Sequence, residues 1–129
     1  MAATRQWPQP EIRFMRQRTL LRVHVAGEST LENTVAYWQA IVDEVRRERP
    51  EAILLIDELQ GERLTGVQWR QLVETMAGHG LEPLRIAHVK PMGLQQIEHC
   101  EIYAREAGFH SRVFDDERRA ELWLRYGES

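Results

Sequence analysis

The sequence predicts an α/β fold with a mixed five-stranded sheet and four helices, in the order ββαβαβαβα. Two short segments near the start alternate apolar and polar residues, which is typical of half-buried strands. Residues 52–56 are apolar without interruption, which indicates a central strand covered on both faces. From residue 28 onward, helical and strand-like segments alternate along the chain, and this order favours parallel pairing.

The first two strands are predicted to form a hairpin. Residues 1–10 are polar and proline-bearing, so we expect a flexible leader there, followed by a single domain over residues 11–129. Apolar and polar side chains alternate around Phe14 and again from Leu21 to Val25. We therefore predict two antiparallel strands that are joined tightly near residues 16–19.

The clearest helix is predicted between residues 29 and 50. Ser29 and Glu32 have the spacing of a capping box at its start, and Pro50 stops it. Apolar residues at helical spacing form one continuous stripe along it, namely Leu31, Val35, Trp38, Ile41, Val42 and Val45.

The second helix is predicted over residues 66–77, shortly after the buried strand. Thr65 and Gln68 have capping-box spacing, and Leu64 with Trp69 has the spacing of a hydrophobic staple. The later elements are strands at 84–89 and 111–114 and helices at about 92–107 and 116–125. Gly108 suits the C′ position after the third helix, where Phe109 supplies the apolar contact that follows.

Composition excludes several classes of function. The 129 residues include 17 basic and 20 acidic side chains that are well mixed, so no basic stripe favours nucleic acid. No apolar run approaches the ~20 residues of a membrane span, and we expect a cytoplasmic protein. The single cysteine, Cys100, stands beside His99, and adjacent helical residues point about 100° apart, so we expect no metal site. We also expect no cofactor.

Charged residues follow two of the predicted strands. Asp57 and Glu58 come where the buried strand leaves its sheet, and His88 and Lys90 end the next strand. The carboxyl ends of strands form the ligand-binding edge of open α/β sheets, and a carboxylate beside a histidine can transfer protons. The alternative is structural, because an Asp at a strand end commonly bonds loop backbone and His88 shares a face with Ile86. We favour the structural interpretation and assign no catalytic residue.

The order of these elements resembles the STAS domain, and in particular its SpoIIAA-like branch of small bacterial proteins. The strand ending in "LLIDEL", the helix opening with "TGV" and the terminal "SRVFDDERRAELWL" carry this resemblance, which covers about residues 11–126. In that family the last helix carries an alanine and a late aromatic-leucine pair, here Ala120, Trp123 and Leu124. The resemblance implies a STAS/SpoIIAA-like fold and a role in protein recognition.

The resemblance also bears on phosphorylation. Typical STAS antagonists carry Asp-Ser-Ser/Thr-Gly-Leu at the second helix, and a partner kinase phosphorylates the first Ser. Aligned on "TGV", this chain has Arg63 at the Asp position and Leu64 at the Ser position. The resemblance therefore implies a non-enzymatic interaction or regulatory module without the usual phosphorylatable serine. We expect its partner-binding surface to comprise Asp57, Glu58, Glu62, Leu64, Thr65, Gly66 and Val67.

Two other functions stay open. Related SpoIIAA-like folds have been grouped with lipid-carrying domains, so a lipid or another small apolar ligand is the alternative, and it requires a cavity between helices and sheet. A small enzyme would use Asp57, Glu58 and His88, and requires a pocket that joins Asp57 to His88. The exposed hairpin edge and Trp7 also offer a self-pairing surface, which predicts a homodimer.

Overall fold

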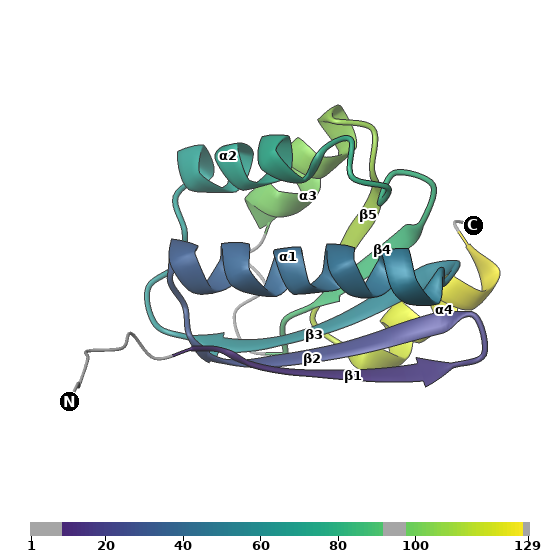
Figure 1. Cartoon of the computed structure of the whole chain (residues 1–129). Coiled ribbons are helices and arrows are strands. Elements are labelled where there is room, and N and C mark those ends of the chain that lie inside the picture. Colours follow the sequence, from purple (N-terminus) through teal and green to yellow (C-terminus); the bar gives the residue numbers. More distant parts are fainter. Residues whose placement is uncertain (1–8, 92–97, 128–129) are drawn as a thin grey trace.

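The computed structural model describes residues 9–91 and 98–127, and over these ranges it confirms the predicted five strands and four helices (Figure 1). Most of the predicted leader, Trp7 within it, and the start of the predicted third helix lie outside the described residues. The elements are β1 (Glu11–Gln17), β2 (Leu20–Glu28), α1 (Leu31–Glu48), β3 (Ala52–Gln60), α2 (Gly66–Met76), β4 (Arg85–Val89), α3 (Glu98–Glu106), β5 (His110–Phe114) and α4 (Glu117–Tyr126).

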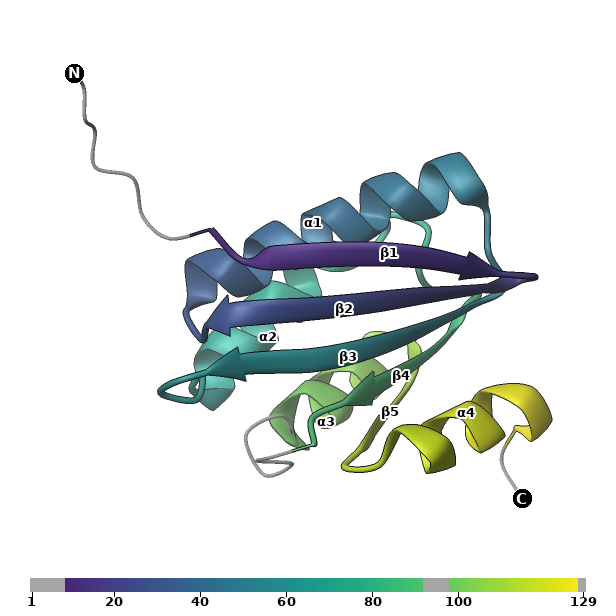
Figure 2. The same ribbon diagram turned by 90° about the horizontal axis from the view of Figure 1, so that it is seen from below.

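The sheet is mixed and follows the chain in the order β1-β2-β3-β4-β5 (Figure 2). β1 pairs antiparallel with β2 in the predicted hairpin, whose turn is Arg18–Thr19, and the remaining neighbours are parallel. β3 is the central strand, as the uninterrupted apolar run predicts.

Helices cover both faces of the sheet, with α1, α2 and α3 on one face and α4 on the other (Figure 1). Successive side chains of a strand point to opposite faces. Ile53 and Leu55 therefore enter the larger core under the three helices, while Leu54 and Ile56 enter the smaller core under α4. This division explains why the first five residues of β3, Ala52 to Ile56, are all apolar. None of the helices in the described part of the chain has the length and apolar character that a bilayer crossing requires.

Several local signals form as predicted. Thr65 and Gln68 make the capping box of α2, and Leu64 and Trp69 are both buried in the larger core. Gly108 has a φ of 94°. Its amide donates to Arg105 O at 3.1 Å, and the Phe109 amide donates to Ala104 O at 2.9 Å, so α3 ends in a Schellman motif.

The predicted start of α1 is wrong by one residue. Thr30, not Ser29, is the N-cap, and its Oγ1 accepts from the Asn33 amide at 3.0 Å. The Ser29 amide instead donates to Gln60 O at 2.7 Å, which binds it to the end of β3. At its other end the helix stops at Glu48, before the left-handed Arg49.

The predicted end of β3 is also wrong. The strand continues past residue 56 to Gln60, because β2 runs beside it to Glu28 and supplies a partner along the whole length. β4 stops earlier, with Val89 opposite Ile56. Asp57 and the residues after it are therefore part of a strand, paired with β2 alone, and they do not form a turn.

Candidate functional site

A buried ionic cluster lies at the carboxyl ends of β3 and β4. Its members are Asp57, His88 and Lys90, which are 3%, 0% and 3% exposed. Asp57 Oδ2 is 2.8 Å from His88 Nε2, and Asp57 Oδ1 accepts from Lys90 Nζ at 3.2 Å. The sequence predicts that these three side chains share one edge of the sheet, and the structure brings them into direct contact.

The pleat of the strands places all three on the same face. Asp57 follows Leu55 at a spacing of two residues on β3, and His88 follows Ile86 at the same spacing on β4. Lys90 continues this spacing one residue past the end of β4. Each continues an apolar column and therefore points into the larger core. This parity is visible in the sequence for Asp57 and His88, whereas the burial of Lys90 also depends on the early end of β4.

Lys90 also satisfies the backbone where β4 ends. The carbonyl of Leu59 lies beyond the last residue pair between β3 and β4, and it accepts from Lys90 Nζ at 2.7 Å. The Leu59 amide donates to Asp57 Oδ1 at 3.0 Å. A buried backbone group without a partner is costly, so this ammonium takes the place of a missing strand neighbour.

The cluster holds Asp57 in its ionised form. Burial alone would raise the pKa of Asp57, but the hydrogen bond with His88, the charges of His88 and Lys90 and the Leu59 amide together lower this pKa below its ordinary value. The carboxylate of Asp57 also affects the pKa of Tyr37. Burial raises the pKa of Tyr37 well above its ordinary value, and the negative charge of Asp57 raises it further.

Aromatic rings enclose His88. The ring centroids of Trp38 and Trp69 lie 6.3 and 6.2 Å from that of His88, both in edge-on geometry. An ionised Asp57 can only accept, so Nε2 donates to it, and among the described residues Nδ1 has no hydrogen-bond partner. Because His88 is wholly buried, Nδ1 does not meet solvent in this arrangement.

An open hollow of about 470 Å³ lies at the same end of the sheet. Asp57 and Lys90 border it, but His88 does not, so this hollow does not join Asp57 to His88 as an acid-base site would require. Its lining comprises Ala26, Gly27, Asp57, Glu58, Leu59, Gln60, Lys90 and Pro91.

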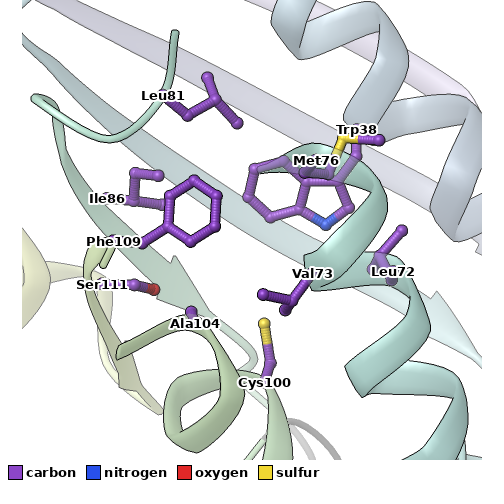
Figure 3. Close-up of a pocket in the computed structure, with 10 residues that line it drawn as sticks. All are labelled: Trp38, Leu72, Val73, Met76, Leu81, Ile86, Cys100, Ala104, Phe109 and Ser111. Carbon is purple, nitrogen blue, oxygen red and sulfur yellow. The ribbon is translucent and has the colours of Figure 1, made fainter. Parts of the chain in front are cut away.

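A small apolar cavity lies between the three helices and the sheet (Figure 3). Its volume is about 30 Å³, whereas sites for drug-sized ligands span about 300–1,000 Å³. Cys100 borders it, and burial, with the charges of Asp57 and Glu101, raises the pKa of this thiol to about 12. The cavity is lined by Trp38, Leu72, Val73, Met76, Leu81, Ile86, Cys100, Ala104, Phe109 and Ser111.

The residues predicted to bind a partner separate into three groups. Asp57 and Leu64 are buried, so in this arrangement neither side chain is exposed to a partner. Glu58 points to the opposite face, where its Oε1 is 2.7 Å from His24 Nε2. The others lie together at the start of α2, where Gly66 is half-buried and Glu62, Thr65 and Val67 are exposed.

Sequence reasoning missed the surroundings of the cluster. It placed Trp38 and Trp69 in the core correctly, but it did not bring them to His88, and it omitted Tyr37. In the part of the chain that the structure describes, no three His, Cys, Asp or Glu side chains are placed to hold a metal ion.

Comparisons with known proteins support the fold. No family model matches the chain, and no curated protein matches it either. It is similar to the crystal structure of an uncharacterised protein of the DUF3478 family with a SpoIIAA-like fold from Shewanella loihica, with a TM-score of 0.58 and 16% identity over 95% of this chain and 99% of the other. The NMR structure of the protein TM1081 is 12% identical over 98% of both chains, with a TM-score of 0.49. The first similarity shows that the chain has a SpoIIAA-like fold.

Proposed function

We propose that this chain is a regulatory interaction module that binds a protein partner through the start of α2 and does not use a phosphorylated serine. The proposed contact, the α2-start surface, consists of Glu62, Thr65, Gly66 and Val67. The observation that carries the proposal is the exposure of Val67, which is 66% accessible although it is apolar and stands beside a well-ordered helix cap. Single exposed apolar side chains are common on protein surfaces. The position of Val67 in the first turn of a capped helix is what favours it as a contact, because a side chain on a fixed element loses little conformational entropy on binding.

The capping geometry supports a module without a phosphoswitch. Thr65 Oγ1 accepts from the Gln68 amide at 3.1 Å, and Gln68 Oε1 accepts from the Thr65 amide at 2.9 Å. A phosphate on Thr65 would sit on the oxygen that accepts from the Gln68 amide, so it would disturb or replace the capping box. The residue before it, Leu64, occupies the position of the phosphorylated serine in the resemblance, and it is a buried aliphatic side chain.

The interior of the protein favours partner recognition over catalysis and over binding of an apolar ligand. His88 is enclosed, so the Asp57–His88 pair lacks the access that an acid-base enzyme needs. The cavity beside Trp38 would have to expand roughly tenfold to reach the size of ordinary ligand sites. An interaction module, by contrast, requires only a stable scaffold and an exposed contact surface.

Site-specific photo-crosslinking tests the proposal. A photoreactive amino acid replaces Val67 in one variant and Leu122 in a control variant, since Leu122 is also apolar and exposed but lies on α4. In the cells that make this protein, we expect one defined adduct from position 67 and none of that mass from position 122. In a binding assay with purified proteins, a Val67→Glu variant should no longer bind that partner. Equal labelling from both positions, or a partner that still binds Val67→Glu, would contradict the proposal.

A further inference from the structure

An open groove of about 780 Å³ lies on the α4 face of the sheet, at the end where β1 and β2 are joined. The last turn of α4 points toward this end of the sheet (Figure 2). Leu20 and Leu124 pack against the smaller core, yet both are only half-buried, and together with Ala52 they line the groove. The smaller core therefore reaches the surface here and gives the groove an apolar floor.

Two exposed arginines border this floor. Arg18 comes from the hairpin turn, and Arg125 comes from the last turn of α4. Among the residues that the structure describes, neither guanidinium has an ion-pair partner. Glu121 also lines the groove, but its carboxylate already has a partner, since Arg22 Nη1 lies 3.6 Å from it. The groove therefore offers two available positive charges beside an apolar surface.

The backbone of Arg18 has an unusual conformation for an arginine. Its φ is 56°, in the left-handed region, and it is the first residue of the two-residue turn between β1 and β2. Such turns favour glycine or asparagine at positions of positive φ, because a larger side chain is strained there. Strained residues of this kind are concentrated at functional sites. The turn by itself does not explain why an arginine occupies this position.

The turn is also fixed on both sides. Arg16 Nε donates to the carbonyl of Arg18, and Arg16 Nη1 donates to Glu48 O at 2.7 Å, which ties the turn to the end of α1. The carbonyl of Thr19 accepts from the Glu51 amide at 2.7 Å, just before β3. The guanidinium of Arg18 therefore extends from an ordered backbone, which lowers the entropy that binding would cost.

We propose that this groove, the hairpin groove, binds an acidic segment of a partner protein that also carries aliphatic side chains. The aliphatic side chains cover the floor, and carboxylates of the segment pair with Arg18 and Arg125. Arginine suits this role because its planar guanidinium binds a carboxylate through two parallel hydrogen bonds. Nucleic acids and anionic membranes are bound by larger basic surfaces, whereas this chain has a net charge of −3.

The hairpin groove and the α2-start surface lie at opposite ends of β3. Ala52, the first residue of β3, lines the groove, and α2 follows the other end of the strand. The strand has nine residues at about 3.3 Å each, so its ends are about 26 Å apart. The chain can therefore hold two partners at once, and this inference does not depend on the proposed function.

NMR titration of the full chain tests the proposal with a defined probe, the blocked peptide Asp-Leu-Glu-Leu-Asp. We expect saturable shifts of the backbone amides of Arg18, Thr19, Leu20 and Ala52. A peptide with lysine in place of each acid should cause none, and one with serine in place of each leucine should bind more weakly. No shifts up to about 2 mM peptide, or equal shifts with the lysine peptide, would overturn the proposal.

Three variants separate binding from folding. Arg18→Gly and Arg125→Gln should each weaken peptide binding about threefold or more, because each removes one charge pair. Arg18→Gly should melt at the wild-type temperature or above, since glycine adopts a positive φ without strain. The control is Arg119→Gln, which removes the same charge from α4 outside the groove, where the side chain is 73% exposed, and it should bind like the wild type. Equal weakening in all three variants, or a loss of stability in Arg18→Gly, would contradict the role of the groove.

Discussion

Asp57 on β3 and His88 on β4 lie 2.8 Å apart, carboxylate oxygen to ring nitrogen, in the interior of the protein. A carboxylate also orients an imidazole in hydrolytic sites, but there it binds Nδ1, whereas Asp57 binds Nε2. Here rings of Trp38 and Trp69 meet His88 edge-on, and Lys90 holds the second carboxylate oxygen. The pair therefore joins two strands at the point where their backbone pairing ends.

Replacing Asp57 should strongly destabilise the fold. In Asp57→Asn the side chain keeps its shape, but the buried ammonium of Lys90 loses its counter-charge. Removing one partner of a buried ion pair typically costs about 3–5 kcal/mol. Urea denaturation measures the loss in the free energy of unfolding. Glu58→Gln, the adjacent carboxylate on the exposed face, is the control and should lose at most about 1 kcal/mol. Equal losses for the two variants would show that the buried cluster does not stabilise the fold.

Asp57 should also make the stability of the fold fall in acid. The pKa of Asp57 is lowered in the folded chain from its reference value of 3.8, so between the two values the unfolded chain binds more protons. The contribution is complete well above pH 3.8 and disappears as the pH falls through 3.8 toward the lower pKa of the folded state. Denaturation midpoints measured at a series of pH values should fall less steeply in acid for Asp57→Asn. Identical acid slopes for the two proteins would contradict this assignment.

The cap at Thr65 should contribute measurable stability. Thr65→Ala removes the acceptor of the Gln68 amide and should cost about 0.5–2 kcal/mol. Thr75→Ala on the same helix is the matched control. Thr75 lies in the last turn of α2, where its hydroxyl donates to Gln71 O and caps no helix end. Alanine has the higher helix propensity, so this variant should be neutral or slightly more stable. The melting temperatures of the two variants decide the matter, and a Thr65→Ala protein as stable as the wild type would disprove the cap.

The thiol of Cys100 should be unreactive in the native protein. Its pKa of about 12 leaves only about one molecule in ten thousand as thiolate at pH 8, and the side chain is buried. The chain has one cysteine, so a colorimetric thiol reagent reports on this position alone. We expect negligible reaction in buffer and one equivalent in denaturant. Rapid reaction in buffer would mean that the cavity beside Trp38 opens readily.

Much of the fold follows from periodicity in the sequence. The run from Ala52 to Ile56 identifies the central strand, because only a strand with helices on both faces needs apolar residues at consecutive positions. Capping residues placed the start of α2 and the end of α3 correctly. Ser29 and Thr30 are adjacent hydroxyls that can each cap a helix, and the bond from Ser29 to β3 decides between them. That contact joins residues far apart in the sequence, so local spacing cannot show it.

The candidate site was predicted less completely for a related reason. Asp57 and Glu58 have the composition of a turn, yet β2 extends the strand through them and the pleat sends their side chains to opposite faces. Their adjacency in the sequence therefore does not make one acidic surface. A lysine after a strand is usually exposed, and the burial of Lys90 depends on the early end of β4. Such a consequence of strand lengths becomes visible only when neighbouring strands are paired.

The central claim is that the start of α2 is a recognition surface that works without phosphorylation. Intact-mass spectrometry of the protein purified from the cells that make it tests this most directly. The proposal predicts a single species at the mass of the unmodified chain, because Leu64 has no hydroxyl and the Thr65 hydroxyl serves as the helix cap. A substantial species heavier by one phosphate, located at Thr65 by fragmentation, would contradict the claim and make this threonine a switch.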